Sequence, residues 1–429
     1  MRQRFALTVL TAGLALTGSG LGVWLAGNHP LWPWTLLIGF AVWSLAVAYW
    51  PRLWLLLVPA ALPLLNFSPW SGWLMFEEFD LLLLGAAAGG YARLAVLGCG
   101  PVALGREARG VTFAPSARPA ASVWVWGALL LCLGVSAGLA LWRGLADAGV
   151  WAFNWFDGHT APLNSVRVFK SLGHALLLAP LIHGAMQREP ERSMRLLAAG
   201  VLTGLAVVSL AVLWERHAFP GLFDFSSRYR TTALFWEMHV GGAAIDAFLA
   251  MSLPFLVWAL VAARRPLVWL AVAVLAVLAV YAVLTTFSRG VYLAAAVPSA
   301  GLASLVASRW FRSVRLGGAS HPASVGRVRS PGWKVVGSGL LAVALLTEVA
   351  AVSMAGTYMG ERMGVADRDF AKRLAHWGDG LSVLATPAQW LFGIGLGRLP
   401  AHYAREVAGG EFSGAVTWLR ESGPPRPAG

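Results

Sequence analysis

The sequence has little charge and almost no cysteine. Charged residues make up 12% of its 429 positions, and its two cysteines are Cys99 and Cys132. Two cysteines cannot build a disulfide framework or, alone, a metal site. The motifs Gly-x-x-x-x-Gly-Lys-Ser/Thr, His-Glu-x-x-His and Cys-x-x-Cys are also missing. We therefore expect no metal and no cofactor, and an enzyme of this sequence would need a substrate that is already activated.

Long apolar runs are what the sequence has in abundance. Hydrophobic residues make up 58% of the chain, and most runs are long enough to cross a hydrocarbon core of ~30 Å. This pattern predicts an all-α polytopic membrane protein with about eleven transmembrane helices. The expected spans are 5–27, 31–50, 52–66, 79–98, 121–142, 166–186, 195–213, 241–262, 267–286, 291–308 and 335–356. The third contains Pro59 and Pro63, so we expect it to be tilted, broken or re-entrant.

The distribution of charge predicts the orientation. If the N-terminus lies inside, the inside loops and span ends carry 18 basic and three acidic residues, whereas the rest of the chain carries 15 basic and 17 acidic residues. Basic residues concentrate in the cytoplasmic loops of membrane proteins. The net charge of +13 therefore indicates topology, and we expect no nucleic-acid partner.

The expected spans divide the chain into two parts. Residues 1–356 form the transmembrane domain, and residues 357–429 form an outer-face, periplasmic segment. Phe370, Leu374 and Trp377 recur at helical spacing in this segment, which predicts an amphipathic helix on the membrane surface that covers the outer ends of the spans. The chain ends in an alternating segment, which suggests either a truncated outer domain or a different C-terminus.

Arginines at the outer ends of the spans are the strongest candidates for binding a ligand. Arg289 lies in a short break between two apolar runs, and Arg228 and Arg230 lie in the outer loop 214–240. A guanidinium binds phosphate oxygens through two parallel hydrogen bonds. The alternatives are that Arg289 snorkels at a span end and that the loop charges pair with one another, for example Glu215 with Arg216.

Other ionisable groups are further candidates. Asp246 lies inside an expected span, where a charge either serves function or pairs with a buried arginine. Arg167, Lys170 and His174 share one helical face and could extend a positive outer vestibule. His402 follows a glycine-rich turn, where we expect mobility.

Three segments together resemble the O-antigen ligase/polymerase family of bacterial inner membranes. They are the outer loop 228–235, the triplet Ser288-Arg289-Gly290 at a span boundary, and 373–403 with its run Leu391-Phe392-Gly393-Ile394-Gly395-Leu396-Gly397. The chain departs from the family in two ways. It lacks a Gly-x-x-Gly-Thr-x-Trp run after the histidine, and it has no span after the glycine-rich stretch.

The resemblance implies glycan transfer on the outer face of the inner (plasma) membrane. The donor would be an undecaprenyl-pyrophosphate-linked glycan, and the acceptor a hydroxyl of a glycan, lipid or protein. Arg228, Arg230 and Arg289 match the family's pyrophosphate-binding arginines, with Arg373 as a further donor-binding residue. His376 is the nearest match to the catalytic base.

The proton acceptor has alternatives within the sequence. His239 and Glu237, in the outer loop 214–240, could also take the proton, and so could His402. The alternative function is a transporter or exporter of a polysaccharide or lipid-linked glycan. Such a protein would need related halves with broken helices and charges near the bilayer midplane. The sequence shows no internal repeat, which favours the enzyme.

Overall fold

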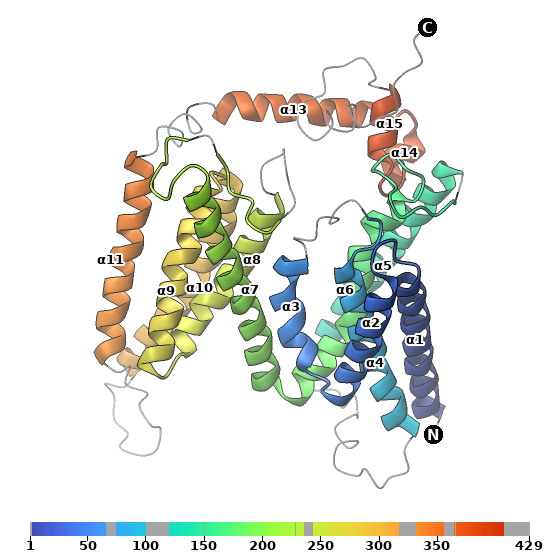
Figure 1. Ribbon diagram of the computed structural model, residues 1–429, viewed down its shortest axis with the longest axis horizontal. Helices are drawn as coiled ribbons and strands as arrows, with labels where there is room; N and C mark the ends of the chain where they lie inside the picture. Colours follow the sequence, from blue (N-terminus) through green and yellow to red (C-terminus); the bar gives the residue numbers. More distant parts are fainter. Residues whose placement is uncertain are drawn as a thin grey trace. The chain divides into compact units, whose positions relative to one another are not determined.

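The computed structural model describes residues 2–65, 74–99, 120–149, 151–227, 229–235, 243–316, 332–355, 364 and 366–406. Within these ranges the chain is helical with connecting loops and contains no strand (Figure 1). The helices are α1 (Arg2–Gly27), α2 (Pro33–Tyr49), α3 (Leu53–Leu65), α4 (Glu78–Cys99), α5 (Ala120–Ala148), α6 (Asn164–Arg188), α7 (Pro190–Ala218), α8 (Ala243–Ala262), α9 (Pro266–Thr285), α10 (Arg289–Leu316), α11 (Gly332–Ala355), α13 (Ala366–Ser382), α14 (Pro387–Phe392) and α15 (Leu399–Glu406).

Each of the eleven apolar runs expected to span a membrane coincides with a helix, from α1 to α11. Among the described residues, eight helices are long and apolar enough to cross a bilayer, namely α1, α4, α5, α6, α7, α8, α9 and α11. Inside hydrocarbon every backbone polar group must bond within its own segment, and a helix achieves this. The chain is therefore an all-α, multi-pass membrane protein.

The third apolar run is helical in spite of its prolines. Pro59 and Pro63 both lie inside α3, which has 13 residues. At about 1.5 Å per residue this helix is roughly 20 Å long, which is shorter than the hydrocarbon core. This span was expected to be tilted, broken or re-entrant. A broken helix is wrong for residues 53–65, because α3 is continuous over them.

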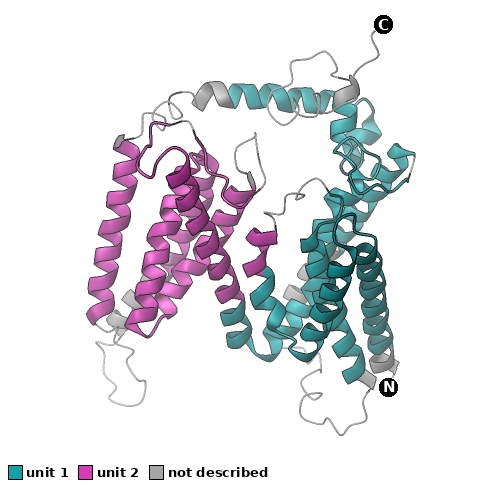
Figure 2. Cartoon of the chain, viewed as in Figure 1, with its two compact units in different colours: residues 1–58, 68–196, 370–429 teal, residues 59–67, 197–369 magenta. Residues whose placement is uncertain are grey.

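The described chain forms two compact units (Figure 2). Unit 1 comprises residues 1–58, 68–196 and 370–429, and unit 2 comprises residues 59–67 and 197–369. In unit 1, small residues of α4 let neighbouring helices approach closely: a Cβ at Gly89 would lie 2.1 Å from the carbonyl oxygen of Ser44 on α2. The buried core of this unit includes Trp54, Leu55 and Tyr91.

A buried charge cluster joins α4 to α6 in unit 1. The Nζ atom of Lys170 lies 2.6 Å from Oδ2 of Asp80, and Nδ1 of His174 lies 3.5 Å from Oδ1 of the same carboxylate. Asp80 and His174 are buried. Of the three residues expected to extend a positive vestibule, Lys170 and His174 are instead engaged with Asp80, and Arg167 donates to the carbonyl oxygen of Leu74 at 3.2 Å.

Unit 2 has an apolar core built from α7, α8, α9 and α10. Leu205, Val208, Leu249 and Ala282 are fully buried in it. Helix α9 ends at Thr285 and α10 begins at Arg289, so three residues make the turn between them. One of these is Phe287, which is buried in the same core and adopts a left-handed φ of 50°.

Candidate anion-binding site

The carboxylate of Glu215, near the end of α7, holds the loop that follows. Glu215 is 5% exposed. It accepts hydrogen bonds from the hydroxyl of Tyr229 at 2.7 Å, from the backbone N–H of Thr232 at 3.1 Å and from that of Ala233 at 2.6 Å. The suggested pairing of Glu215 with Arg216 is wrong, because the carboxylate binds the loop instead.

Arg216 and aromatic side chains hold the first half of the same loop. Arg216 is fully buried, donates to the carbonyl oxygen of Asp224, and lies 5.7 Å from the ring centre of Phe225. The ring of Phe219 stacks on Tyr229 at 5.6 Å. Burial raises the pKa of Tyr229, and its hydrogen bond to Glu215 raises that pKa further. The Tyr229 hydroxyl therefore stays protonated at neutral pH and remains a donor.

The loop places Arg230 against the turn between α9 and α10. The Nε atom of Arg230 donates to the carbonyl oxygen of Thr286 at 2.7 Å. One residue on, the Thr231 hydroxyl lies 3.4 Å from that of Thr285. Arg230 and the turn between α9 and α10, more than fifty residues apart in sequence, therefore meet in one unit.

Asp246, in the first turn of α8, lies beside Arg230. Its Oδ2 is 3.9 Å from Nη2 of the arginine, and the two side chains are 16% and 21% exposed. Of the two interpretations given to Asp246, the structure shows the pairing with an arginine. At this distance the contact is electrostatic rather than a hydrogen bond, so it helps to hold a guanidinium that Thr286 has already oriented.

Arg289 is the first residue of α10 and is half-buried. The first turn of a helix leaves backbone N–H groups without helical partners and carries a partial positive charge. Arg289 and this helix terminus favour an anion, which is the kind of ligand that helix N-termini bind, and Arg230 contacts the same turn through the carbonyl oxygen of Thr286. Two residues here, Ala233 and Phe287, have left-handed φ values of 51° and 50°. Such conformations cost non-glycine residues free energy and cluster at functional sites.

Three of the residues named from sequence, Arg228, Glu237 and His239, lie outside the described residues. Arg373 and His376 are exposed on α13. They lie one helical turn apart, in unit 1.

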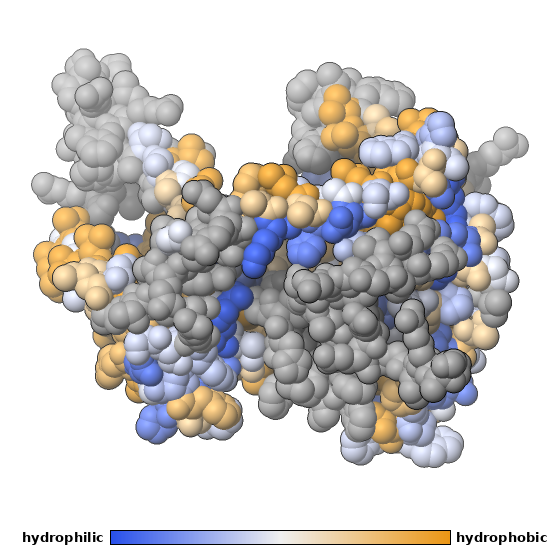
Figure 3. Space-filling view, turned by 90° about the horizontal axis from the view of Figure 1, so that it is seen from above, coloured by the Kyte–Doolittle hydropathy of each residue, from blue (hydrophilic) through white to orange (hydrophobic). Residues whose placement is uncertain are grey.

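Helix α13 is amphipathic, as the sequence predicts. Phe370, Leu374 and Trp377 are exposed, and their spacing places them on one face. Figure 3 shows hydrophobic and hydrophilic residues running side by side along this helix. On a helical wheel His376 falls about 100° from Trp377, on the polar side.

The glycine-rich stretch after α14 packs closely on α5 and α6. The N–H of Leu396 donates to the carbonyl oxygen of Ala140 at 2.8 Å, and the side-chain amide of Asn164 donates to that of Gly397 at 2.7 Å. A Cβ at Gly395 would lie 2.6 Å from the backbone of Gly144. Gly395 also has a φ of +114°, so only glycine fits both the conformation and the approach.

Asp147 fixes the far end of this stretch. Its carboxylate accepts from Nε of Arg398 at 2.8 Å and lies 3.0 Å from Nε2 of His402. Arg398 and His402 are 8% and 6% exposed. The expectation that His402 is mobile is wrong, because it is buried and hydrogen-bonded. Sequence reasoning missed this cluster, and an acid near the end of an apolar run was the one available signal.

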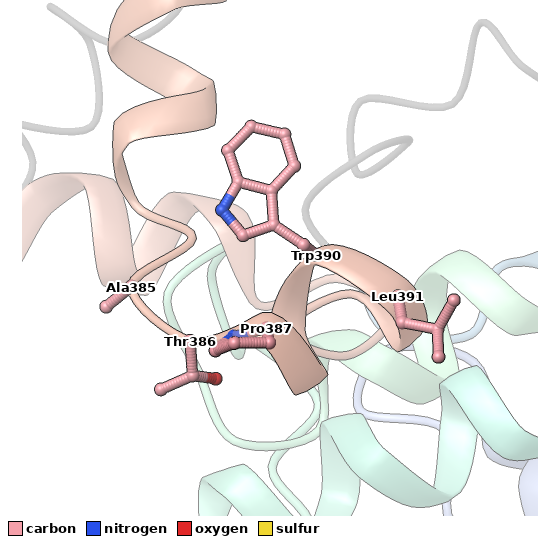
Figure 4. Close-up of a pocket in the computed structure, with 5 residues that line it drawn as sticks. All are labelled: Ala385, Thr386, Pro387, Trp390 and Leu391. Carbon is pink, nitrogen blue, oxygen red and sulfur yellow. The ribbon is translucent and has the colours of Figure 1, made fainter.

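A shallow pocket of about 720 Å³ lies at α14, lined by Ala385, Thr386, Pro387, Trp390 and Leu391 (Figure 4). The indole of Trp390 lies on one side of it, and the polar groups of the lining side chains are the Trp390 ring nitrogen and the Thr386 hydroxyl. None of the lining side chains is ionisable. This pocket therefore has no group to neutralise a phosphate, and it is not a candidate for the anion.

Comparisons with protein-family models, with curated protein sequences and with solved structures find no match to this chain.

Proposed function

We propose that this protein transfers a glycan from an undecaprenyl-pyrophosphate donor to an acceptor hydroxyl at the outer face of the bacterial inner membrane, as O-antigen ligases and polymerases do. The observation that supports it most is the position of Arg230. Its guanidinium bonds to Thr286, three residues before Arg289 at the first turn of α10. Two arginines and a helix N-terminus suit a diphosphate.

The chemistry follows from the bond that must break. The acceptor oxygen bonds to the anomeric carbon as the bond from that carbon to the pyrophosphate oxygen breaks, and undecaprenyl pyrophosphate leaves. Negative charge grows on the leaving diphosphate, where Arg230 and Arg289 stabilise it. We assign the departing proton to His376, because it is the nearest match to the base of the family that the chain resembles and an imidazole nitrogen can accept a proton. His239 and Glu237 are the alternatives. The step needs no metal or cofactor.

The topology that accompanies this function has eleven spans, the N-terminus inside and residues 357–429 in the periplasm. It rests on the excess of basic residues in alternate loops. The exposed apolar face of α13 would then lie on the outer leaflet, since an amphipathic helix outside the hydrocarbon buries its apolar face in the interface. Membrane lipids are thus expected partners as well as the donor and acceptor.

Donor binding tests the proposal. The wild-type protein is purified in detergent, and its affinity for undecaprenyl pyrophosphate is measured by native mass spectrometry, with undecaprenol as the uncharged ligand. We expect Arg289→Lys to weaken pyrophosphate binding about tenfold or more, since lysine keeps the charge and loses the bidentate fork.

The matched control is Arg195→Lys. The Arg195 side chain is 68% exposed and pairs with Glu191 on the surface of α7, so this variant should bind as the wild type does. Equal affinity for undecaprenyl pyrophosphate and undecaprenol, or an unchanged affinity in Arg289→Lys, would overturn the proposal and leave Arg289 as a snorkelling anchor.

A further inference from the structure

We infer that Glu215 is the positioning residue of the anion site and that it acts through Arg230. The inference rests on the proposed function for its ligand, a pyrophosphate. The distances and burial that carry it belong to unit 2 alone. Glu215 is outside the motifs that resemble the ligase family.

The hydrogen bonds of Glu215 bracket Arg230 along the chain. On one side the carboxylate accepts from the hydroxyl of Tyr229, and on the other side from the backbone N–H groups of Thr232 and Ala233. A loop residue held on both sides has few conformations open to it. Arg230 can therefore keep its Nε on the Thr286 carbonyl without a secondary structure of its own.

Only a glutamate meets the requirements of this position. An ionised carboxylate has two acceptor oxygens and no donor, and here it meets three residues that donate to it. A glutamine would turn its NH₂ group toward at least one of those donors. An aspartate is one methylene shorter and cannot reach the bonds from the same helical position. Because Glu215 is 5% exposed, water cannot readily replace a lost acceptor.

The bond to Ala233 has a second consequence. Ala233 adopts a φ of 51°, a conformation that alanine rarely takes. The 2.6 Å hydrogen bond from its N–H to Glu215 stabilises that conformation. Without this acceptor the segment would relax toward ordinary dihedrals and carry Arg230 away from Thr286.

The test is a double-mutant cycle read out by donor affinity. Single variants Glu215→Gln and Arg230→Lys, and the double variant, are titrated with undecaprenyl pyrophosphate. We expect each single change to weaken binding about tenfold, and the double change to weaken it no further than one of them. Such non-additivity is the sign of two residues acting as one unit. Glu215→Gln and Arg289→Lys should lose affinity more nearly additively.

Two further variants separate positioning from folding. Tyr229→Phe removes a single donor, keeps the ring stack on Phe219, and should weaken binding by a smaller factor of about threefold. Glu191→Gln is the control, because the Glu191 side chain is 91% exposed and should not matter. The thermal unfolding midpoint of each variant is measured alongside. Loss of affinity at an unchanged midpoint is the expected result for Tyr229→Phe.

A readout without ligand distinguishes the two ways of failing. Ser227→Cys, placed in a protein with both native cysteines changed to serine, reports loop exposure through its rate of maleimide labelling. We expect Glu215→Gln to raise that rate about tenfold. If the wild type binds no pyrophosphate but labelling accelerates, the proposed function fails while Glu215 still holds the loop. If labelling and affinity are both unchanged in Glu215→Gln, or if the losses add fully, the inference is wrong.

Discussion

The glycine-rich stretch after α14 offers a prediction whose size can be worked out from the structure. At Gly395, φ is +114° and a Cβ would lie 2.6 Å from the backbone of Gly144. The neighbouring atoms are backbone, so no side chain can rotate away, and Gly395→Ala must lift the stretch off α5. The left-handed backbone costs about 1–2 kcal/mol. Loss of the hydrogen bond from the Leu396 N–H to the Ala140 carbonyl oxygen costs about 1 kcal/mol.

Lifting the stretch also weakens the charged contacts of Asp147. Hydrogen bonds to charged groups contribute roughly 1.5–3 kcal/mol, which brings the expected loss of docking free energy to about 3.5–6 kcal/mol. Hydrogen–deuterium exchange of the Leu396 amide measures this opening directly. Since each 1.4 kcal/mol is a factor of ten, the amide should exchange at least about 100-fold faster in Gly395→Ala than in the wild type.

Two other glycines are matched controls for Gly395→Ala. Gly393 also has a left-handed φ, of +73°, but its nearest neighbour would lie 3.9 Å from a Cβ, and a Cβ at Gly378 in α13 would meet nothing within 4 Å. Gly393→Ala should therefore cost only the backbone term of about 1–2 kcal/mol. Gly378→Ala should leave exchange unchanged or slow it slightly. If Gly395→Ala exchanges no faster than Gly393→Ala, the close approach to α5 is not what fixes this stretch.

Three further predictions concern topology, acid sensitivity and the base. Reporter fusions at Ser320 and Gly409 should report an inside and an outside location respectively. The same location at both sites would contradict the proposed topology. Burial lowers the pKa of His29 below 6.5, against the attraction of Glu78, and its neutral ring accepts two backbone N–H groups. The free energy of unfolding should therefore fall as pH drops below about 6.5. The difference between the thermal unfolding midpoints at pH 7.5 and pH 5.5 should be smaller in His29→Asn than in the wild type. His376→Ala should lose transfer by about 100-fold or more with donor affinity kept; full transfer would reassign the base to His239 or Glu237.

The helices were predictable from sequence because the bilayer leaves the backbone little choice. An apolar run in hydrocarbon has to form its hydrogen bonds internally, so run length and composition predicted every helix from α1 to α11. The positions of Pro59 and Pro63 did not predict where a helix ends. Each removes one backbone donor, yet α3 continues through both.

The meeting of Arg230 with the turn at Arg289 was predictable in part, because both lie at ends of runs on the same side of the proposed topology. Their partners were not. Glu215 and Arg216 are adjacent in sequence, but neighbours on a helix point about 100° apart. One therefore binds Tyr229 and the other Asp224. A pairing guessed from adjacency fails for this geometric reason.

The same limit applies to pairs made across long distances in sequence. Lys170 and His174 have the spacing of a positive helical face, yet Asp80, 90 residues before Lys170, neutralises it. His402 forms a hydrogen bond with Asp147, which lies 255 residues away in sequence. Helix packing decides which charges meet, and a single sequence holds no record of that packing.

The central claim, that the arginines of unit 2 serve glycan transfer from a lipid-linked pyrophosphate, is tested most directly in proteoliposomes. The purified protein is reconstituted with a short undecaprenyl-pyrophosphate oligosaccharide and a glycan acceptor, without nucleotide and in the presence of a chelator, and the products are identified by mass spectrometry. We predict an elongated acceptor and free undecaprenyl pyrophosphate with the wild type, and about tenfold less of both, or lower still, with Arg289→Lys. Donor that crosses the bilayer with its glycosidic bond intact, or donor that stays unchanged, would contradict the claim.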